Sequence, residues 1–433
     1  MNVVVSKSPS VVVRPSEPKK TSATTMKLSS FDVGLVRRTA TALLVFEHPL
    51  HDAAETIQRA LSQTLVDYYP ISGRIVAAGD GDNDVHIECT GEGVAFVAAS
   101  ANCALKEATT FFNRPPGAWT TTTTTALLDE LALDYPGEGC GGPTDPLLLV
   151  QVTQFSCGGF TVGVTWNHGI ADGTGMAQFL QAVGELARGL PSPSVAPVRW
   201  DDSLPSLPPS VAALEQLAMS LEPLDLARLG IAVPYGLIRR IKAESGELCT
   251  TFEAVAAVLW RCRTRAIISD PDSLALLSFP ANVRKHVGAK NGYYGNCITQ
   301  QLVMATSGAV ASAEIVELVE MIKCAKEETA GQLVNRSSGD YDHLLQAIDL
   351  EQIGHLQYGA LNVSSWRNLG FNKADFGAGT PAKVMCYGKP LQTMPLCVVG
   401  LPCKGSDGQD NVFSVCVKQE HVDAFLKELA SLA

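Results

Sequence analysis

The sequence lacks several patterns that mark particular classes of protein. None of its twelve cysteines stands in a C-x-x-C pair, so neither a zinc ribbon nor a redox dithiol is indicated, and reduced thiols are expected. No run approaches the roughly 20 apolar residues of a membrane span. Charge, serine and proline interrupt the first 20 residues before an apolar signal region can form, so no signal peptide is expected. Together these absences predict a cytoplasmic protein without a membrane span.

Charged residues are few, and one sign dominates. They make up 18% of the 433 residues, against 46% hydrophobic residues, and the formal net charge is −11. This composition is typical of a globular protein with a sizeable core. The acidic balance would repel nucleic acid, so no nucleic-acid partner is expected, and a polyanionic ligand would need a local basic site.

The periodicity of apolar residues predicts two α/β halves. A helix is indicated where Ile57, Leu61, Leu65 and Tyr68 follow the i, i+3, i+4, i+7 pattern, and a hairpin where two β-rich runs meet at a Cys-Gly-Gly turn (147–167). Seven prolines between 189 and 223 indicate a crossover linker on the outside of the molecule. We therefore predict an N-terminal domain at 1–188, a linker at 189–223 and a C-terminal domain at 224–433.

The hairpin leads into TWNHGIADGTG, residues 165–175, which carries His168 and Asp172. A turn between a strand and a helix is a place where loops present functional groups, and Gly169, Gly173 and Gly175 would permit close approach by a ligand. Histidine suits a general base near neutral pH because its unperturbed pKa is about 6.5. The aspartate could orient the imidazole or pair with a cation elsewhere, and spacing alone does not choose between these roles.

Other chemistries are less well supported by the same stretch. H-x-x-x-D can place two metal ligands on one helical face, but the glycines argue against a continuous helix and no third ligand is evident, so no metal is expected. No G-x-S-x-G elbow occurs. Cys157 could be imagined as an acyl-carrying nucleophile, although a buried residue at a strand end is the simpler interpretation.

A second glycine-rich stretch is DFGAGTPA, residues 375–382. Gly377, Gly379 and Ala382 formally match the dinucleotide pattern G-x-G-x-x-A, which requires a helix afterwards. The following AKVMCY instead reads as a strand. We therefore favour a structural turn in which Phe376 packs inward and the glycines supply the bend.

Taken together, the two stretches resemble the signatures H-x-x-x-D-G and D-F-G-W-G of the BAHD acyltransferases, a plant family that transfers acyl groups from coenzyme A thioesters. The resemblance extends along the chain. It includes LSSFD (28–32), YYPISGR (68–74), IECTGEGVAFV (87–97), TTFEAVAAVLWR (250–261), FPANVRK (279–285), GYYGN (292–296) and SSWRNLGF (364–371). It implies an α/β fold of two chloramphenicol-acetyltransferase-like domains, with mixed sheets flanked by helices and an active-site channel at the domain interface.

The resemblance also assigns roles to residues of the first signature. His168 would be the general base that deprotonates the acceptor during direct attack on the thioester, without a covalent acyl-enzyme. Asp172, followed by Gly173, would be structural, and it would pair with Arg284 of the N-x-R segment.

The second signature, D-F-G-W-G, stands here as Asp375, Phe376, Gly377, Ala378 and Gly379, with alanine in place of the tryptophan. Ala378 therefore removes the indole N–H that the family is sometimes credited with using to support the thioester carbonyl. A donor such as the Thr380 hydroxyl, a backbone N–H or water would have to replace it. Lys285 and Lys290 lie in one turn with Arg284 and are candidates for binding the phosphates of coenzyme A.

The sequence thus predicts a monomeric acyltransferase with acyl-CoA as co-substrate and no permanently bound cofactor. It would move a hydroxycinnamoyl or benzoyl group to a hydroxyl or amine of a plant specialised metabolite or cell-wall precursor. An acetyl- or malonyl-specific enzyme, a non-catalytic relative that binds CoA esters or a partner protein, and a peptide-synthetase condensation domain are the alternatives. The last normally carries two adjacent histidines, whereas Asn167 precedes His168 here.

Overall fold

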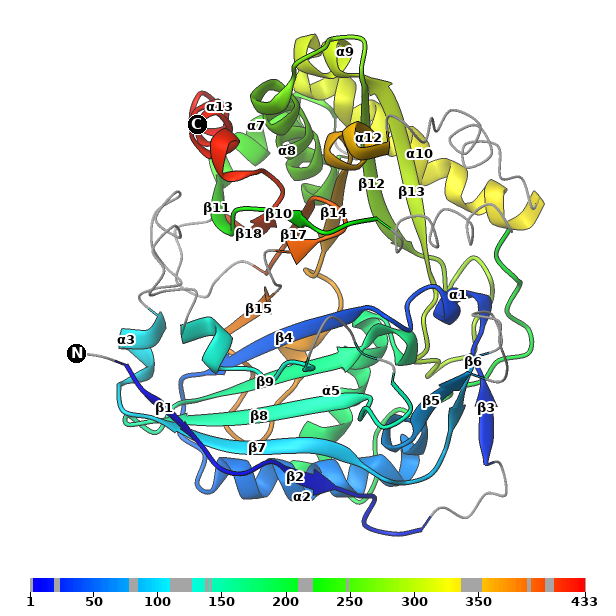
Figure 1. Cartoon of the computed structure of the whole chain (residues 1–433), viewed down its shortest axis with the longest axis vertical. Coiled ribbons are helices and arrows are strands. Elements are labelled where there is room, and N and C mark those ends of the chain that lie inside the picture. Colours follow the sequence, from blue (N-terminus) through cyan, green and yellow to red (C-terminus); the bar gives the residue numbers. More distant parts are fainter. Residues whose placement is uncertain are drawn as a thin grey trace.

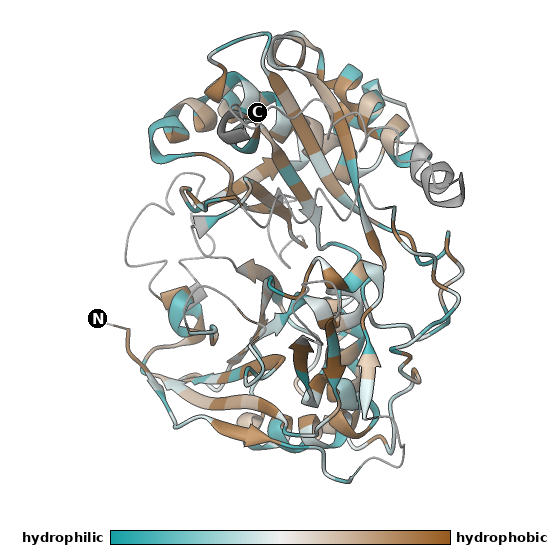
Figure 2. Ribbon diagram, turned by 45° about the vertical axis from the view of Figure 1, so that its right-hand side comes forward, coloured by the Kyte–Doolittle hydropathy of each residue, from teal (hydrophilic) through white to brown (hydrophobic). Residues whose placement is uncertain are grey.

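The chain folds into two lobes, each built on a mixed β-sheet with helices against it (Figure 1). The apolar residues gather in the strands of both sheets (Figure 2). None of the helices in the part of the chain described below is long and apolar enough to cross a membrane. The structure is a computed structural model, and it describes residues 3–18, 24–77, 85–109, 127–136, 140, 142–208, 221–246, 249–335, 353–387, 391–401 and 409–432.

The first sheet has the strand order β1-β7-β8-β9-β4-β15, and β2 also pairs with β7. The β7–β8 pair is parallel and the other pairs are antiparallel. The hairpin predicted at 147–167 is confirmed as β8 and β9. The strands are β1 (Val5–Lys7), β2 (Val11–Val13), β4 (Thr39–Phe46), β7 (Val94–Ala101), β8 (Leu148–Phe155), β9 (Phe160–Asn167) and β15 (Lys383–Tyr387).

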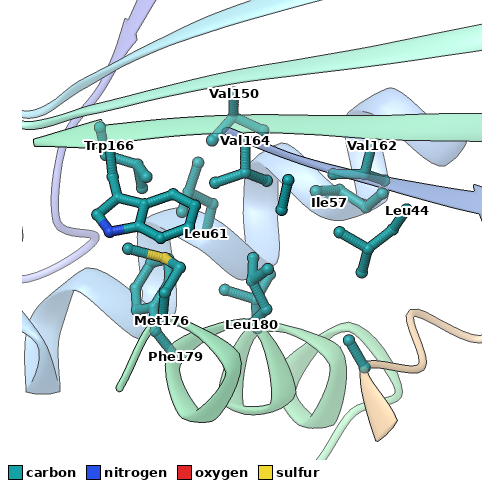
Figure 3. Close-up of a cluster of buried hydrophobic side chains, with 14 of the residues drawn as sticks. Leu44, Ile57, Leu61, Val150, Val162, Val164, Trp166, Met176, Phe179 and Leu180 are labelled. Atoms are coloured by element: carbon teal, nitrogen blue, oxygen red, sulfur yellow. The ribbon is translucent and has the colours of Figure 1, made fainter. Parts of the chain in front are cut away.

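Helices α2 (Ala53–Asp67) and α5 (Gly173–Ala187) cover one face of this sheet. The predicted apolar face of α2 is confirmed, since all four residues that defined it are buried. In Figure 3 the side chains of Ile57 and Leu61, and those of α5, meet the residues of β8 and β9 that point to the same face. Trp166, the last of these on β9, is fully buried and ends the apolar layer directly beneath the His168 turn.

A smaller antiparallel sheet, β3-β6-β5, stands beside the first. Its strands are β3 (Thr25–Lys27), β5 (Arg74–Ala77) and β6 (Val85–Glu88). Strands β5 and β6 form an antiparallel pair. After β6 the chain turns at Gly91 and Gly93, whose φ angles are 70° and 98°, and continues into β7 of the large sheet. Short helices here are α1 (Ser30–Val33), η1 (Tyr69–Ser72) and α3 (Leu105–Thr109). Much of the threonine-rich stretch at 113–146 lies outside the described residues.

The second sheet has the order β11-β18-β17-β14-β12-β13 and is also mixed. Its main helix, α8, begins at an N-cap, Thr250, whose side chain and that of Glu253 form a capping box. The elements of this lobe are β10 (Leu224–Asp225), β11 (Leu229–Pro234), α7 (Tyr235–Glu244), α8 (Thr251–Ile267), β12 (Leu274–Asn282), β13 (Ile298–Thr306), α9 (Ser307–Ser312), α10 (Ile315–Asn335), α12 (Ile353–Gly359), β14 (Leu361–Ser365), β16 (Leu391–Gln392), β17 (Leu396–Val399), β18 (Gln409–Val415), η5 (Gln419–His421) and α13 (Val422–Ala430). The short helix η4 (Phe371–Lys373), which follows β14 in the sequence, packs against α5 in the first lobe.

Chain segments cross between the lobes in two places. Strand β15, late in the sequence, pairs with β4 in the first sheet, so residues 383–387 belong structurally with the first half. Just before it, Phe376 is buried in the first core, with its ring 5.4 Å from that of Phe46, and Gly377 and Gly379 have positive φ angles. The inward Phe376 and the glycine bend predicted for this stretch are confirmed.

The second crossing is the proline-rich stretch at 189–223, of which 209–220 lies outside the described residues. It was predicted to run over the outside of the molecule, and all of 189–196 except Pro193 is exposed. Further along the stretch the prediction is wrong, because Val198 pairs with Tyr293, and the side chains of Arg199 and Asp201 are almost wholly buried. The reason is electrostatic, because Asp201 accepts hydrogen bonds from the backbone of Lys290 and Ser203, and Arg199 pairs with a buried carboxylate.

Candidate active site

His168 lies where β9 ends, in a short 3-10 turn, η3 (His168–Ile170), that precedes α5. Its backbone N–H donates to the carbonyl of Arg38 at 2.8 Å, which fixes the turn to the chain before β4. The residue is half-buried. The ring is held by Asn296 of the loop before β13, so the imidazole sits where the two halves of the chain meet.

The hydrogen bonds of Asn296 determine which ring nitrogen of His168 carries the proton. The Asn296 Nδ2 donates to Asp32 Oδ1 at 2.9 Å and to the His168 carbonyl at 2.8 Å, so the amide oxygen is the atom that faces His168 Nδ1, at 3.1 Å. An amide oxygen only accepts, so Nδ1 must donate. Neutral imidazole has one N–H, and Nε2 is therefore the unprotonated nitrogen, with no partner among the described residues.

Burial is the largest influence on the His168 pKa, and it lowers the pKa below the usual 6.5. The Asp172 carboxylate opposes this shift, and the Arg38 guanidinium adds to it. The lowered pKa keeps the ring neutral near pH 7, which is the form that can accept a proton.

Asp172 caps α5 and is committed to a buried ion pair. Its Oδ1 accepts from the Gly175 N–H at 2.9 Å and from Arg284 Nη2 at 2.9 Å. Its Oδ2 accepts from Arg284 Nη1 at 2.7 Å and from the Cys297 N–H at 3.1 Å. Both oxygens are therefore occupied away from the imidazole, and the structure brings Asp172 and Arg284 together in a bidentate pair.

Gly173 and Gly175 lie in close contact with other parts of the protein itself. A Cβ at Gly175 would lie 1.8 Å from the Tyr294 carbonyl oxygen, and one at Gly173 would lie 2.6 Å from a methyl carbon of Leu369. The sequence suggested that a ligand approaches these glycines closely. At Gly175 the approaching group is the loop that carries Asn296, so this glycine lets the two halves dock.

The other predicted residues lie apart from the imidazole. Ala378 is buried in the first core, and Thr380 is exposed. Lys285 and Lys290 are exposed on the loop after Arg284, and the Lys290 ammonium lies 3.2 Å from Asp201 Oδ1. No contact among the described residues joins any of the four to His168.

One indole, Trp166, lies near the imidazole, and a second, Trp366, lies one ring beyond it; their N–H groups differ in whether they already have a partner. The Trp166 ring centroid is 6.4 Å from that of His168, but its Nε1 donates to the Ala171 carbonyl at 2.9 Å. Trp366, 6.4 Å from Trp166, stacks on Phe371 at 5.1 Å and is 8% exposed. Its Nε1 has no hydrogen-bond partner in the described part of the chain, so it can still donate to a substrate.

Sequence reasoning did not single out Asn296, Asp32 or Trp366 as site residues. Each lay within a segment that carried the family resemblance, in GYYGN, LSSFD and SSWRNLGF, so a signal was present. Asp32 and Asn296 are 264 residues apart, and their contact could not be obtained from spacing.

Two alternatives to a histidine base are a Cys157 nucleophile and a metal site. Cys157 is exposed in the β8–β9 turn, which corrects the expectation of a buried residue, and β9 separates it from His168 by eight strand residues, or about 26 Å. Among the described residues, no group of His, Cys, Asp and Glu side chains could hold a metal ion. A cavity of about 690 Å³ is lined by residues 223–227 and 418–420 of the second lobe and includes none of the site residues.

Comparison with known proteins shows the family to which the chain belongs. The model of the Transferase family matches residues 3–226 and 239–432. The chain is 44% identical over 446 residues to Acyl transferase 15 of Oryza sativa subsp. japonica, covering 100% of this chain and 99% of that protein. It is 31% identical to myricetin 3-O-glucosyl 1,2-rhamnoside 6'-O-caffeoyltransferase AT2 of Crocosmia x crocosmiiflora, covering 99% of each.

Among solved structures, vinorine synthase superposes with a TM-score of 0.73 at 20% identity, covering 99% of this chain and 98% of that one. This likeness shows the two-domain α/β fold. The family model spans nearly the whole chain, and the relatives match it from end to end. The chain belongs to the Transferase family, as a plant BAHD acyltransferase.

Proposed function

We propose that this acyltransferase moves an acyl group from a coenzyme A thioester to the hydroxyl or amine of a small plant metabolite, with His168 as the general base. The observation that carries the proposal is the bond between His168 Nδ1 and the Asn296 oxygen, since it leaves Nε2 as the proton acceptor. The half-buried imidazole combines access for an acceptor with a lowered pKa.

The proposed reaction has two proton transfers and no covalent enzyme intermediate. Nε2 takes the proton of the acceptor O–H or N–H as that atom attacks the thioester carbonyl carbon. The tetrahedral intermediate then collapses, the C–S bond breaks, and the imidazolium returns the proton to the departing thiolate. Asn296 accepts from Nδ1–H throughout and so stabilises the transient imidazolium.

The intermediate needs a donor for its oxyanion, and Ala378 cannot supply one. We propose the Trp366 indole for this role in addition to the earlier candidates, the Thr380 hydroxyl, a backbone N–H or water. The indole is held by stacking on Phe371 and lies one ring beyond Trp166, with its N–H unused by the described residues.

Trp366→Phe is expected to lower kcat about 10²- to 10³-fold, as removal of one oxyanion donor does, with little change in KM. Steady-state kinetics would measure this. Trp260→Phe is the matched control, because Trp260 is buried in the second lobe and its Nε1 makes no hydrogen bond with the described residues. Wild-type kcat in Trp366→Phe would assign the oxyanion to another donor.

The acid limb of the kcat/KM profile is expected below pH 6.5. A group with a lowered pKa stays in its neutral, proton-accepting form until the pH falls through that lower value, so activity should persist into mildly acidic buffer. A pH series of kcat/KM with a non-titrating acceptor tests this. An acid limb above 6.5 would contradict a desolvated base.

Hydroxycinnamoyl and benzoyl groups are the proposed acyl groups, and the caffeoyltransferase relative supports the first of them. Lys285 and Lys290 would contact the phosphates of coenzyme A. We further propose a cytoplasmic monomer with domains at 1–188 and 224–433, joined by 189–223 and sharing β15, and a channel between them that admits both substrates.

The function is tested by following thiol release from a panel of acyl-CoAs with pooled alcohols and amines. Acceptor-dependent release with an aromatic donor is expected. Release only with acetyl- or malonyl-CoA would change the proposed donor class. A folded protein that binds acyl-CoA but releases no thiol with any pair would favour the non-catalytic alternative.

A further inference from the structure

The carboxylate of Asp32, at the start of the chain, is fully buried beside the Asn296 amide. Its Oδ1 accepts from the Asn296 backbone N–H at 3.1 Å and from the Asn296 Nδ2 at 2.9 Å. Its Oδ2 accepts from the Ser29 backbone N–H at 2.9 Å and from the Ser29 hydroxyl at 2.6 Å. Asp32 is therefore fixed by its own helix cap and presents one oxygen to Asn296.

Arg199, from the crossover stretch, balances this buried charge. Its Nη2 lies 3.2 Å from Asp32 Oδ2 and 3.1 Å from the Gly169 carbonyl oxygen, next to His168. The side chain is 3% exposed, and its Nε and Nη1 make no hydrogen bond with the described residues. A buried guanidinium with so few partners depends on the Asp32 carboxylate for its compensation.

Two acceptors, the Asp32 carboxylate and the His168 carbonyl, decide which way the Asn296 amide faces. Both accept and neither donates, so the Nδ2 end must point to them and the oxygen end to His168 Nδ1. Without the carboxylate, only the His168 carbonyl would hold the Nδ2 end. The amide could then rotate and present an N–H to Nδ1, which would move the imidazole proton to Nε2 and abolish the base.

We propose that Asp32, held by Arg199, is a positioning residue that keeps the His168 proton on Nδ1 by fixing the Asn296 amide. The inference rests on the proposed role of His168. Its structural basis is a series of contacts between three segments. Arg199 of the crossover stretch pairs with Asp32 of LSSFD, Asp32 accepts from Asn296 of the GYYGN loop, and Asn296 accepts from His168 Nδ1.

Other titratable groups around the network do not replace this carboxylate. Tyr293 and Cys297 face Asp32, and burial raises the pKa of both, that of Cys297 to about 12, so they stay neutral near pH 7. On the His168 side, the charges of Asp172 and Arg38 shift the pKa of the ring without a hydrogen bond to it. The Asp172 carboxylate accepts its hydrogen bonds from Arg284 and from backbone N–H groups.

The test compares Asp32→Asn and the double variant Asp32→Asn/Arg199→Gln with the wild type. The double variant removes both buried charges, so it is the one expected to fold if the single variant does not. We expect kcat to fall at least about tenfold at unchanged KM, and by no more than the roughly 10²–10⁴-fold that a general base contributes. Nitrogen-15 histidine spectra should show the His168 proton shifting from Nδ1 toward Nε2.

Glu253→Gln is the matched control, since Glu253 is a buried carboxylate that caps α8 and pairs with Lys326 in the second lobe. It should lower thermal stability and leave kcat and the His168 tautomer unchanged. A folded double variant with wild-type kcat and its proton still on Nδ1 would overturn the proposal. The spectra do not depend on turnover, so they separate this failure from a failure of the proposed reaction.

Discussion

Replacing Asp172 with alanine is expected to lower the free energy of unfolding by about 3–5 kcal/mol, the usual effect of leaving one partner of a buried ion pair uncompensated. Asp172 is 2% exposed, and the change would strand Arg284 and remove the N-cap of α5. The catalytic turn is anchored by these same bonds, so kcat should fall as well. Urea unfolding monitored by circular dichroism measures the stability term.

Two comparisons sharpen this prediction. Glu428→Gln breaks the half-exposed pair with Arg265, whose closest atoms are 3.6 Å apart, and should change stability by no more than about 1 kcal/mol. Asp172→Asn/Arg284→Met should be less destabilised than the sum of its single variants, because the stranded charge is gone. An Asp172→Ala protein with wild-type stability and reduced rate would show that Asp172 acts on the chemistry directly.

Replacing His168 with alanine is expected to reduce kcat about 10²- to 10⁴-fold, the range that general acid–base catalysis contributes. The side chain is half-buried, and its ring donates one side-chain hydrogen bond, to Asn296, so folding should be little affected. Acyl-CoA binding should also be retained, because the proposal assigns the ring to proton transfer. Kinetics and calorimetric titration with acyl-CoA measure the two effects separately.

His51→Ala is the control for this variant. The His51 side chain is 94% exposed and lies in the turn before α2, so kcat should remain at the wild-type value. Undiminished turnover in His168→Ala would defeat the assignment of the base. A loss of turnover that paralleled a loss of folded protein would leave stability, and not catalysis, as the role of the ring.

Local patterns were sufficient for the elements that build the site. The helical repeat of Ile57 to Tyr68 and the alternation leading to Trp166 reflect burial on one face of a regular element, which is encoded within a few residues. The turn at Phe376 is also encoded locally, because its glycines favour the positive φ angles that the turn needs.

Contacts between distant segments were beyond such patterns. Spacing could not pair Asp32 with Asn296, join β15 to β4, or bury Arg199 in a proline-rich stretch. These contacts depend on how whole elements pack together and on ion pairs between residues more than a hundred positions apart in the sequence. The family resemblance pointed to Asp172 and Arg284, and their geometry comes from the structure alone.

His168 can act as the base only if its ring proton is on Nδ1. A nitrogen-15 histidine correlation spectrum of the wild-type protein near pH 7 reports the position of this proton. The His168 signals would be assigned by their disappearance in His168→Ala. We expect a neutral ring with its proton on Nδ1 and an unprotonated Nε2. A ring protonated on Nε2, or on both nitrogens at this pH, would contradict His168 as the base.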